Sequence, residues 1–177
     1  MYQHNLFHGL LRQHKKFDSE KKFDAFLAYS SADSKLIPEF VERLEKGSPK
    51  LRLCFYERNW PVGEVISDLI LHSVESSKRT IILMTSNFLK SDWARFELIT
   101  AIKATSKDKT LRLIIIMYPD VKSTKQLGRK INDYLIFTTY LKRNDPNFWN
   151  KLIYAMPHDT TEPEEGADEF ELMRLPT

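Results

Sequence analysis

The sequence predicts an α/β fold, a doubly wound and five-stranded parallel sheet with helices on both faces. Short apolar runs of strand length alternate with amphipathic segments of helix length from residue 23 to residue 156. The first run, residues 23–28, is almost entirely apolar and leads at once into a helix start, which is typical of a strand buried in a parallel sheet. Such sheets meet ligands and partners at the ends of their strands, so functional residues are expected in the segments that follow the strands.

The first half of the chain predicts three strands and two helices. Residues 30–33 (Ser-Ser-Ala-Asp) cap a helix that Gly47 ends. A strand at 51–56, a loop at 57–63, a helix from 64 or 65 to 76 and a β-branched strand at 79–84 follow. Apolar residues at helical spacing mark the inner faces of the two helices: Ile37, Phe40, Val41 and Leu44 on the first, and Ile66, Leu69, Ile70 and Val74 on the second.

The second half completes the alternation. A polar loop with Ser86 and Asn87 precedes a helix expected at 92–105. The next elements are a strand at 111–118, a helix at 123–136 that Gly128 weakens, an edge strand at 137–141 and a closing helix at 146–156. Right-handed crossovers between these strands give a flavodoxin-like sheet.

Charge divides the chain into three parts. Residues 1–21 are basic and resemble a juxtamembrane linker, residues 22–158 form the folded domain, and residues 159–177 form an acidic tail that we expect to be disordered. The tail carries seven acids and one base, so the remainder carries a net charge of +9 although the whole chain carries +3. A basic body suits nucleic acid or the inner membrane leaflet, but a solvated lysine-rich surface is the simpler interpretation.

Composition and motifs exclude several classes of function. A single cysteine, Cys54, excludes an internal disulfide framework and a multi-cysteine zinc site, and no apolar run reaches 18 residues. Scattered basic residues without a zinc-finger or RNA-recognition signature argue against nucleic acid. We therefore expect no metal, no cofactor and a location in the cytoplasm.

The chain also lacks the residues that receiver domains and nucleotide-binding proteins of this fold need. A phosphate-accepting receiver needs a carboxylate pair after the first strand and an Asp ending the third, but these strands end in Tyr-Ser-Ser and Met-Thr-Ser. A nucleotide site needs a glycine-rich turn after the first strand, and no glycine lies between Leu10 and Gly47.

The loop at 57–63 (Glu-Arg-Asn-Trp-Pro-Val-Gly) follows a strand directly and contains residue types that dominate binding hot spots. Pro61 and Gly63 would stiffen and turn it, and they would expose Trp60 and Val62 beside Arg58. The alternative is a surface loop whose Trp60 folds back on the core.

Three motifs together resemble those of a Toll/interleukin-1 receptor (TIR) domain. Residues 23–30 resemble box one, residues 54–63 resemble box two, and Phe148-Trp149 resembles box three. The segment from Ser86 to Leu98 is similar to the family's stretch between the third strand and the next helix. Residues 139–158 look most like insect Toll receptors, and the resemblance covers roughly residues 22 to 158.

Box two departs from the family pattern Arg-Asp-x-x-Pro-Gly. Asn59 stands in place of the Asp, and Val62 stands where the family places its proline, because Pro61 comes one position early. These differences bear on the identity of the partner rather than on the fold.

The resemblance implies a signalling module of a Toll-type receptor of innate immunity or development. It implies association with other TIR domains, recruitment of a TIR adaptor that carries a death domain, and a place on the cytoplasmic face of a membrane behind a transmembrane helix. The partner-facing residues would be Arg58, Asn59, Trp60, Pro61, Val62 and Gly63. Phe23, Asp24, Phe148 and Trp149 are candidates for either the core or an interface, with the core favoured.

Some TIR domains cleave nicotinamide from NAD with a glutamate on the helix after the third strand. Glu97 occupies the matching position in this sequence. Such a carboxylate could stabilise positive charge that develops on the ribose, as glycosidase carboxylates do. The alternative is that Glu97 pairs with a neighbouring base and only holds its loop in place.

Overall fold

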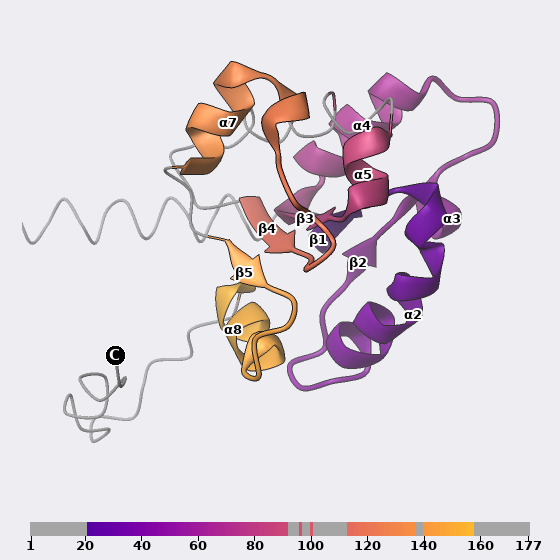
Figure 1. Ribbon diagram of the computed structural model, residues 1–177. Helices are drawn as coiled ribbons and strands as arrows, with labels where there is room; N and C mark the ends of the chain where they lie inside the picture. Colours follow the sequence, from indigo (N-terminus) through magenta and orange to yellow (C-terminus); the bar gives the residue numbers. More distant parts are fainter. Residues whose placement is uncertain (1–20, 92–95, 97–99, 101–112, 137–139, 158–177) are drawn as a thin grey trace, which may run out of the picture.

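A computed structural model describes residues 21–91, 96, 100, 113–136 and 140–157 of the 177-residue chain. Five parallel strands form one sheet in the order β2-β1-β3-β4-β5, which is the flavodoxin-like order (Figure 1). The predicted fold class is confirmed. The strands are β1 (Phe23–Ala28), β2 (Leu53–Cys54), β3 (Ser77–Met84), β4 (Leu113–Met117) and β5 (Leu141–Lys142).

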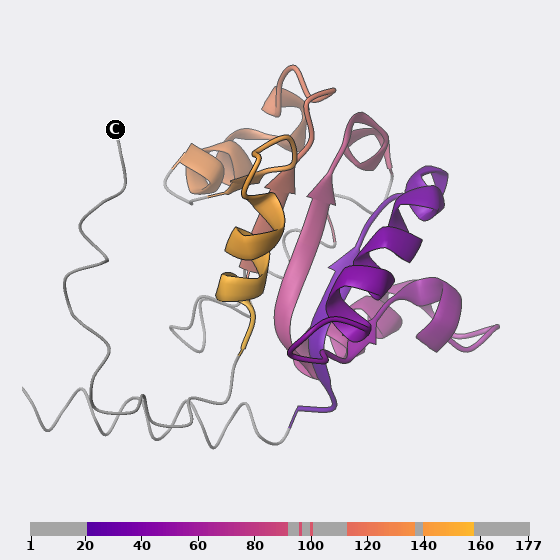
Figure 2. The same cartoon turned by 90° about the horizontal axis from the view of Figure 1, so that it is seen from below.

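Helices cover both faces of the sheet. Those described are η1 (Ser31–Leu36), α2 (Ile37–Phe40), η2 (Val41–Glu45), α3 (Tyr56–Asn59), α4 (Ile66–Glu75), α5 (Ser86–Lys90), η3 (Lys125–Leu127), α7 (Arg129–Ile136) and α8 (Phe148–Ala155). Figure 1 shows α4, α5 and α7 above the sheet and α2 and α8 below it. From below, α8 and the η1–α2–η2 segment lie across the same face (Figure 2).

Alternating side chains of β1 enter the two cores that these layers enclose. Ala25 and Leu27 pack with Phe40 of α2 and Phe148 of α8. Phe26 and Ala28 pack on the other face with the helices above the sheet, whose buried residues include Ile70, Val74, Phe88 and Leu135. A strand buried on both faces follows from its nearly continuous apolar sequence.

Several elements differ from their predicted form. The helix expected at 123–136 is divided into η3 and α7 at Gly128, whose φ of 89° lies outside the helical region. The loop expected at 57–63 begins with the helical turn α3. The polar segment at Ser86 is the start of α5, because Thr85 Oγ1 accepts a hydrogen bond from the Phe88 N–H and caps it.

Some predictions fall outside the described residues. The helix expected at 92–105 is described only at Phe96 and Thr100, both helical, and the edge strand is described from residue 140 onward. Residues 1–20 and 158–177, which contain nearly all of the expected linker and the acidic tail, are not described. In the described ranges, no helix has both the length and the apolar character that crossing a bilayer requires.

Candidate functional site

The loop after β2 begins with a self-contained turn. The backbone N–H groups of Arg58 and Asn59 donate to the Phe55 carbonyl, and Asn59 Oδ1 accepts a hydrogen bond of 3.1 Å from the Phe55 N–H. Asn59 therefore closes the turn through its own side chain, as short Asn side chains do in turns. This contact uses the Asn oxygen, which the family's Asp would also present.

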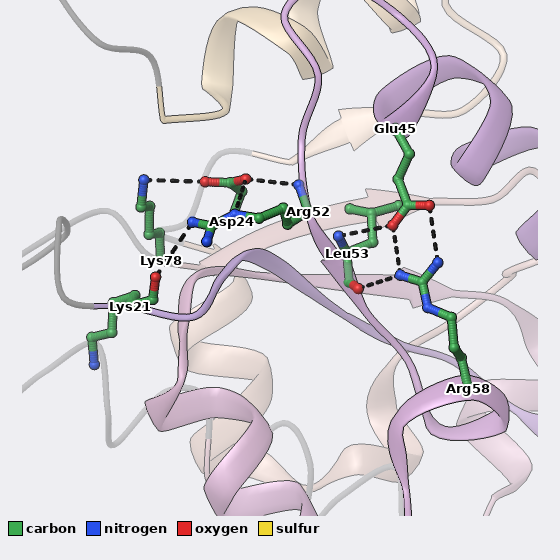
Figure 3. Close-up of polar contacts among 7 residues, drawn as sticks. All are labelled: Lys21, Asp24, Glu45, Arg52, Leu53, Arg58 and Lys78. Carbon is green, nitrogen blue, oxygen red and sulfur yellow. Dashed lines mark hydrogen bonds and ion pairs between the residues drawn. The ribbon is translucent and has the colours of Figure 1, made fainter.

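Arg58 ties this turn to the neighbouring elements (Figure 3). Its guanidinium donates to both carboxylate oxygens of Glu45, at 2.9 and 2.5 Å, and to the Leu53 carbonyl. Glu45 also accepts from the Leu53 N–H at 3.1 Å, so η2, β2 and α3 meet at one ion pair. The hydrogen bond from Arg58 lowers the pKa of Glu45, against a smaller opposing effect of burial.

Trp60 lies half-buried against the core. Its ring stacks on Phe26 of β1 with centroids 6.4 Å apart, and its indole N–H donates to Ser73 Oγ on α4 at 2.9 Å. The ring of Tyr56 contacts it at 5.9 Å. The structure therefore shows Trp60 folded back on the core, which is the alternative that the sequence left open for this residue.

The second part of the loop faces solvent. Residues 61–66, here called the loop tip, are all exposed, and Figure 1 shows the segment between α3 and α4 extending away from the sheet. Val62 is 103% exposed, Val65 60% and Ile66 38%. Gly63 adopts a φ of 91°, which an L side chain rarely tolerates. Three branched apolar side chains thus lie in water on one short segment.

Phe23 and Asp24 lie where β1 begins. Asp24 is 7% exposed, and its carboxylate accepts a 2.7 Å hydrogen bond from the Arg52 N–H and pairs with Lys78 Nζ at 3.1 Å (Figure 3). Burial alone would raise the pKa of Asp24, but these hydrogen bonds outweigh it, so the pKa is lowered. Asp24 joins β1 to β2 and β3 from inside the fold.

Phe148 and Trp149 hold α8 to α2. Phe148 is 1% exposed, and both rings meet the Phe40 ring edge-on, at 6.5 and 5.2 Å. The Arg143 guanidinium lies 4.7 Å from the Phe148 ring centroid and 5.3 Å from that of Trp149. These contacts are those of a packed core with a stacked cation at its rim.

Metal ligands and the candidate Glu97 are the features that bear on catalysis. No group of three or more metal-ligating side chains occurs among the described residues, and Glu97 lies outside the described ranges. An open hollow of about 800 Å³ lies beside α7, and its lining includes Met117, Lys125, Arg129 and Tyr140. None of the residues singled out from the sequence lines this hollow.

Sequence reasoning missed several residues that shape the loop. Glu45 and Ser73 anchor Arg58 and Trp60 from elements that come before and after the loop, and a pattern within the loop could not reveal them. The sequence predicts Ile66 on the inner face of its helix, but it is exposed at the first residue of α4, whose buried residues begin at Ile70. The sequence offered a signal in the position of Ile66 at the predicted start of its helix, where the first turn has no preceding helical turn to pack beside it.

The family model for the TIR domain matches residues 22–152. "Protein toll" of Drosophila melanogaster is 42% identical over 159 residues, which cover 89% of this chain and 14% of that protein. "Toll-like receptor 2" of Bos indicus is 32% identical over 142 residues, which cover 76% of this chain and 18% of that protein. The chain thus spans less than a fifth of the length of these relatives.

Solved structures show the same fold. The TIR domain of the Toll-related receptor TRR-2 from Hydra magnipapillata superposes with a TM-score of 0.56 at 22% identity, covering 75% of this chain and 97% of that one. A metazoan TIR-STING receptor from C. gigas superposes with a TM-score of 0.61 at 24% identity, covering 77% of this chain and 40% of that one. With the sequence matches, these likenesses lead to one conclusion: the chain belongs to the TIR domain family.

Proposed function

We propose that this domain is the intracellular signalling part of a Toll-type receptor. It acts by association with other TIR domains and by recruitment of an adaptor that joins a TIR domain to a death domain. The relatives that match most of this chain are Toll and Toll-like receptors by name, which supports the receptor assignment. A transmembrane helix before the described residues would place the domain at the cytoplasmic face of a membrane.

The observation that carries this proposal is the apolar loop tip on an anchored base. Val62, Val65 and Ile66 are exposed although burying them would release water from branched apolar surface. Arg58 and Trp60 hold the base of the loop through contacts within the domain, so the tip is presented without a large ordering cost. We assign partner contact to Pro61, Val62 and Gly63, and positioning to Arg58, Asn59 and Trp60.

A small apolar surface suffices because the receptor supplies proximity. Tethering two domains raises their effective concentration to the order of millimolar, so a weak contact becomes well populated. Contacts that do not close on themselves would extend into open strands of domains, which would make the response steep.

The test uses the domain fused to a module that dimerises on addition of a small molecule. Energy transfer between labelled copies and co-purification of a TIR adaptor with a death domain report association. Val62→Asp should abolish both signals, while Tyr154→Asp, an equally drastic change at a side chain 79% exposed on α8, should leave them intact. Normal association of the Val62→Asp protein, with an unchanged melting temperature, would refute the assignment of the loop tip.

The NAD-cleaving alternative depends on Glu97, which lies outside the described residues. It predicts nicotinamide release from NAD by the concentrated purified chain, and loss of that release in Glu97→Ala. The signalling proposal predicts no release from either protein and unchanged association in Glu97→Ala.

A further inference from the structure

Basic residues gather where the three neighbouring strands β2, β1 and β3 begin. The strands are parallel and adjacent, with Phe23 opposite Ser77 and Ala25 opposite Leu53, so their amino ends meet at one edge of the sheet. We call this surface the amino edge. Its basic residues are Lys21, Lys22, Lys50, Arg52, Lys78 and Arg79.

The exposed positive charge of this edge comes mainly from Lys22, Lys50 and Arg52. Within the three strand starts the one acid is Asp24, which is buried and already paired with Lys78 and Arg52 (Figure 3). Among the described residues, Glu75 at the end of α4 is the exposed acid nearest along the chain to these strand starts, and its backbone carbonyl accepts a hydrogen bond from Lys21 Nζ. Lys22 and Lys50 are exposed, and the Arg52 side chain is 59% exposed.

The contacts of Asp24 fix the positions of two of the basic residues, Arg52 and Lys78. The Arg52 guanidinium lies 3.4 Å from both Asp24 Oδ2 and the Lys21 carbonyl, which keeps Arg52 beside the start of β1. Asp24 Oδ1 holds Lys78 Nζ, and the Lys78 side chain is 16% exposed. Two cations that a buried carboxylate already holds in place need little further ordering when they meet an anionic surface.

We propose that the amino edge binds the anionic headgroups of a lipid bilayer and seats the domain on the membrane. The inference rests on the proposed receptor function, in which a transmembrane helix precedes residue 21 in the chain. The described part of the chain enters the fold at Lys21, beside the start of β1, so an anchor that precedes it would bring this edge near the bilayer. The loop tip leaves from the carboxyl end of β2, so a domain seated in this way keeps the loop tip accessible to another TIR domain.

The test is flotation of the whole chain with vesicles of phosphatidylcholine alone or of phosphatidylcholine with phosphatidylserine. We expect binding to the anionic vesicles only, and weaker binding as salt is raised, because salt screens exposed charges. A basic residue near an anionic leaflet strengthens binding roughly fivefold, so Lys22→Glu with Lys50→Glu should weaken it by at least about 25-fold. The matched control reverses two exposed lysines elsewhere, Lys122→Glu with Lys142→Glu.

The orientation of the domain on the vesicle gives a second measurement, because attraction by net charge alone would not select one surface. An environment-sensitive dye is attached to Glu75→Cys, at the amino edge, or to Lys122→Cys, after β4; the native Cys54 is buried. Anionic vesicles should shift the emission to the blue for the first position and leave it unchanged for the second. Equal shifts would contradict seating on this edge.

Three outcomes would overturn the proposal. If the Lys22/Lys50 and Lys122/Lys142 variants lost vesicle binding equally, the attraction would depend on net charge alone. If the Lys22/Lys50 variant bound fully, the membrane contact would lie in another part of the chain. Equal competition by inorganic phosphate or duplex DNA at constant ionic strength would show a general anion site. Association of tethered domains in solution should survive the Lys22/Lys50 change, so a failure here is distinguishable from a failure of the proposed function.

Discussion

The two parts of the segment from residue 55 to residue 66 have opposite relations to the rest of the domain. The first part, residues 55–60, contains Arg58, Asn59 and Trp60, each of which has a hydrogen-bond partner inside the fold. The second part, the loop tip, exposes Val62, Val65 and Ile66 to water. Residue types that dominate binding hot spots therefore hold the loop, and smaller apolar residues are presented to partners.

This difference teaches that stability and association should separate along the segment. Changes at residues 55–60 should destabilise the domain and affect association through the position of the loop. Changes at the loop tip should affect association alone.

Truncating Trp60 should have the largest effect on stability. Trp60→Ala removes the contact with Phe26 and leaves Ser73 Oγ without its donor. We expect a loss of about 2 kcal/mol in the free energy of unfolding, below the range for fully buried aromatics because the ring is half-exposed. Chemical denaturation measures it. Trp60→Phe is the matched control, with a smaller loss of about 1 kcal/mol, because it removes the hydrogen bond but keeps an aromatic ring beside Phe26. Full stability of Trp60→Ala would mean that the ring does not anchor the loop.

Removing Arg58 should have the next largest effect. Arg58→Ala leaves Glu45 and the Leu53 carbonyl without the guanidinium that joins them. A bidentate pair of this kind, partly exposed, is worth about 1 kcal/mol. A double-mutant cycle with Glu45→Ala measures the coupling directly. Additive losses from the two changes would show that the ion pair does not position the loop.

The sequence predicts the fold well because its signals are local. The apolar run of residues 23–28 and the helical spacing of Ile37, Phe40 and Leu44 are confirmed as β1 and a buried helix face. The divided helix at Gly128 was harder to predict, since a glycine in a helical pattern indicates weakness but does not decide whether the helix continues.

The candidate site was less predictable because its contacts are non-local. Arg58 and Trp60 read as exposed hot-spot residues when only the loop is considered. Their partners, Glu45 and Ser73, are each 13 residues away in the sequence, and nothing in the spacing pairs them. The exposure of Val62 depends on no distant contact, and the structure leaves this side chain in water as the loop sequence predicts.

Acid should weaken the anchored part through Glu45. Its pKa is lowered in the folded domain, so its contribution to stability is complete above the unfolded pKa of about 4.3 and is lost as the pH falls through the folded value. Unfolding measured from neutral pH down to pH values below about 4 should show a smaller decline in Glu45→Gln than in the native chain. Asp24, whose pKa is also lowered, contributes in the same direction in both proteins, so the difference between them isolates Glu45. Parallel pH curves would contradict a stabilising role for the Glu45 charge.

Substitution at the loop tip should have the smallest effect on stability and the clearest effect on association. Val62 makes no buried contact, so Val62→Asp should change the free energy of unfolding by less than about 0.5 kcal/mol. Association of tethered domains should nevertheless fall, because a carboxylate would have to be desolvated at the contact. Val62→Ile, which keeps an apolar branched side chain, should preserve both properties. If Val62→Asp instead destabilised the domain as Trp60→Ala does, the tip would belong to the anchored part, and the division of this segment between holding and binding would be wrong.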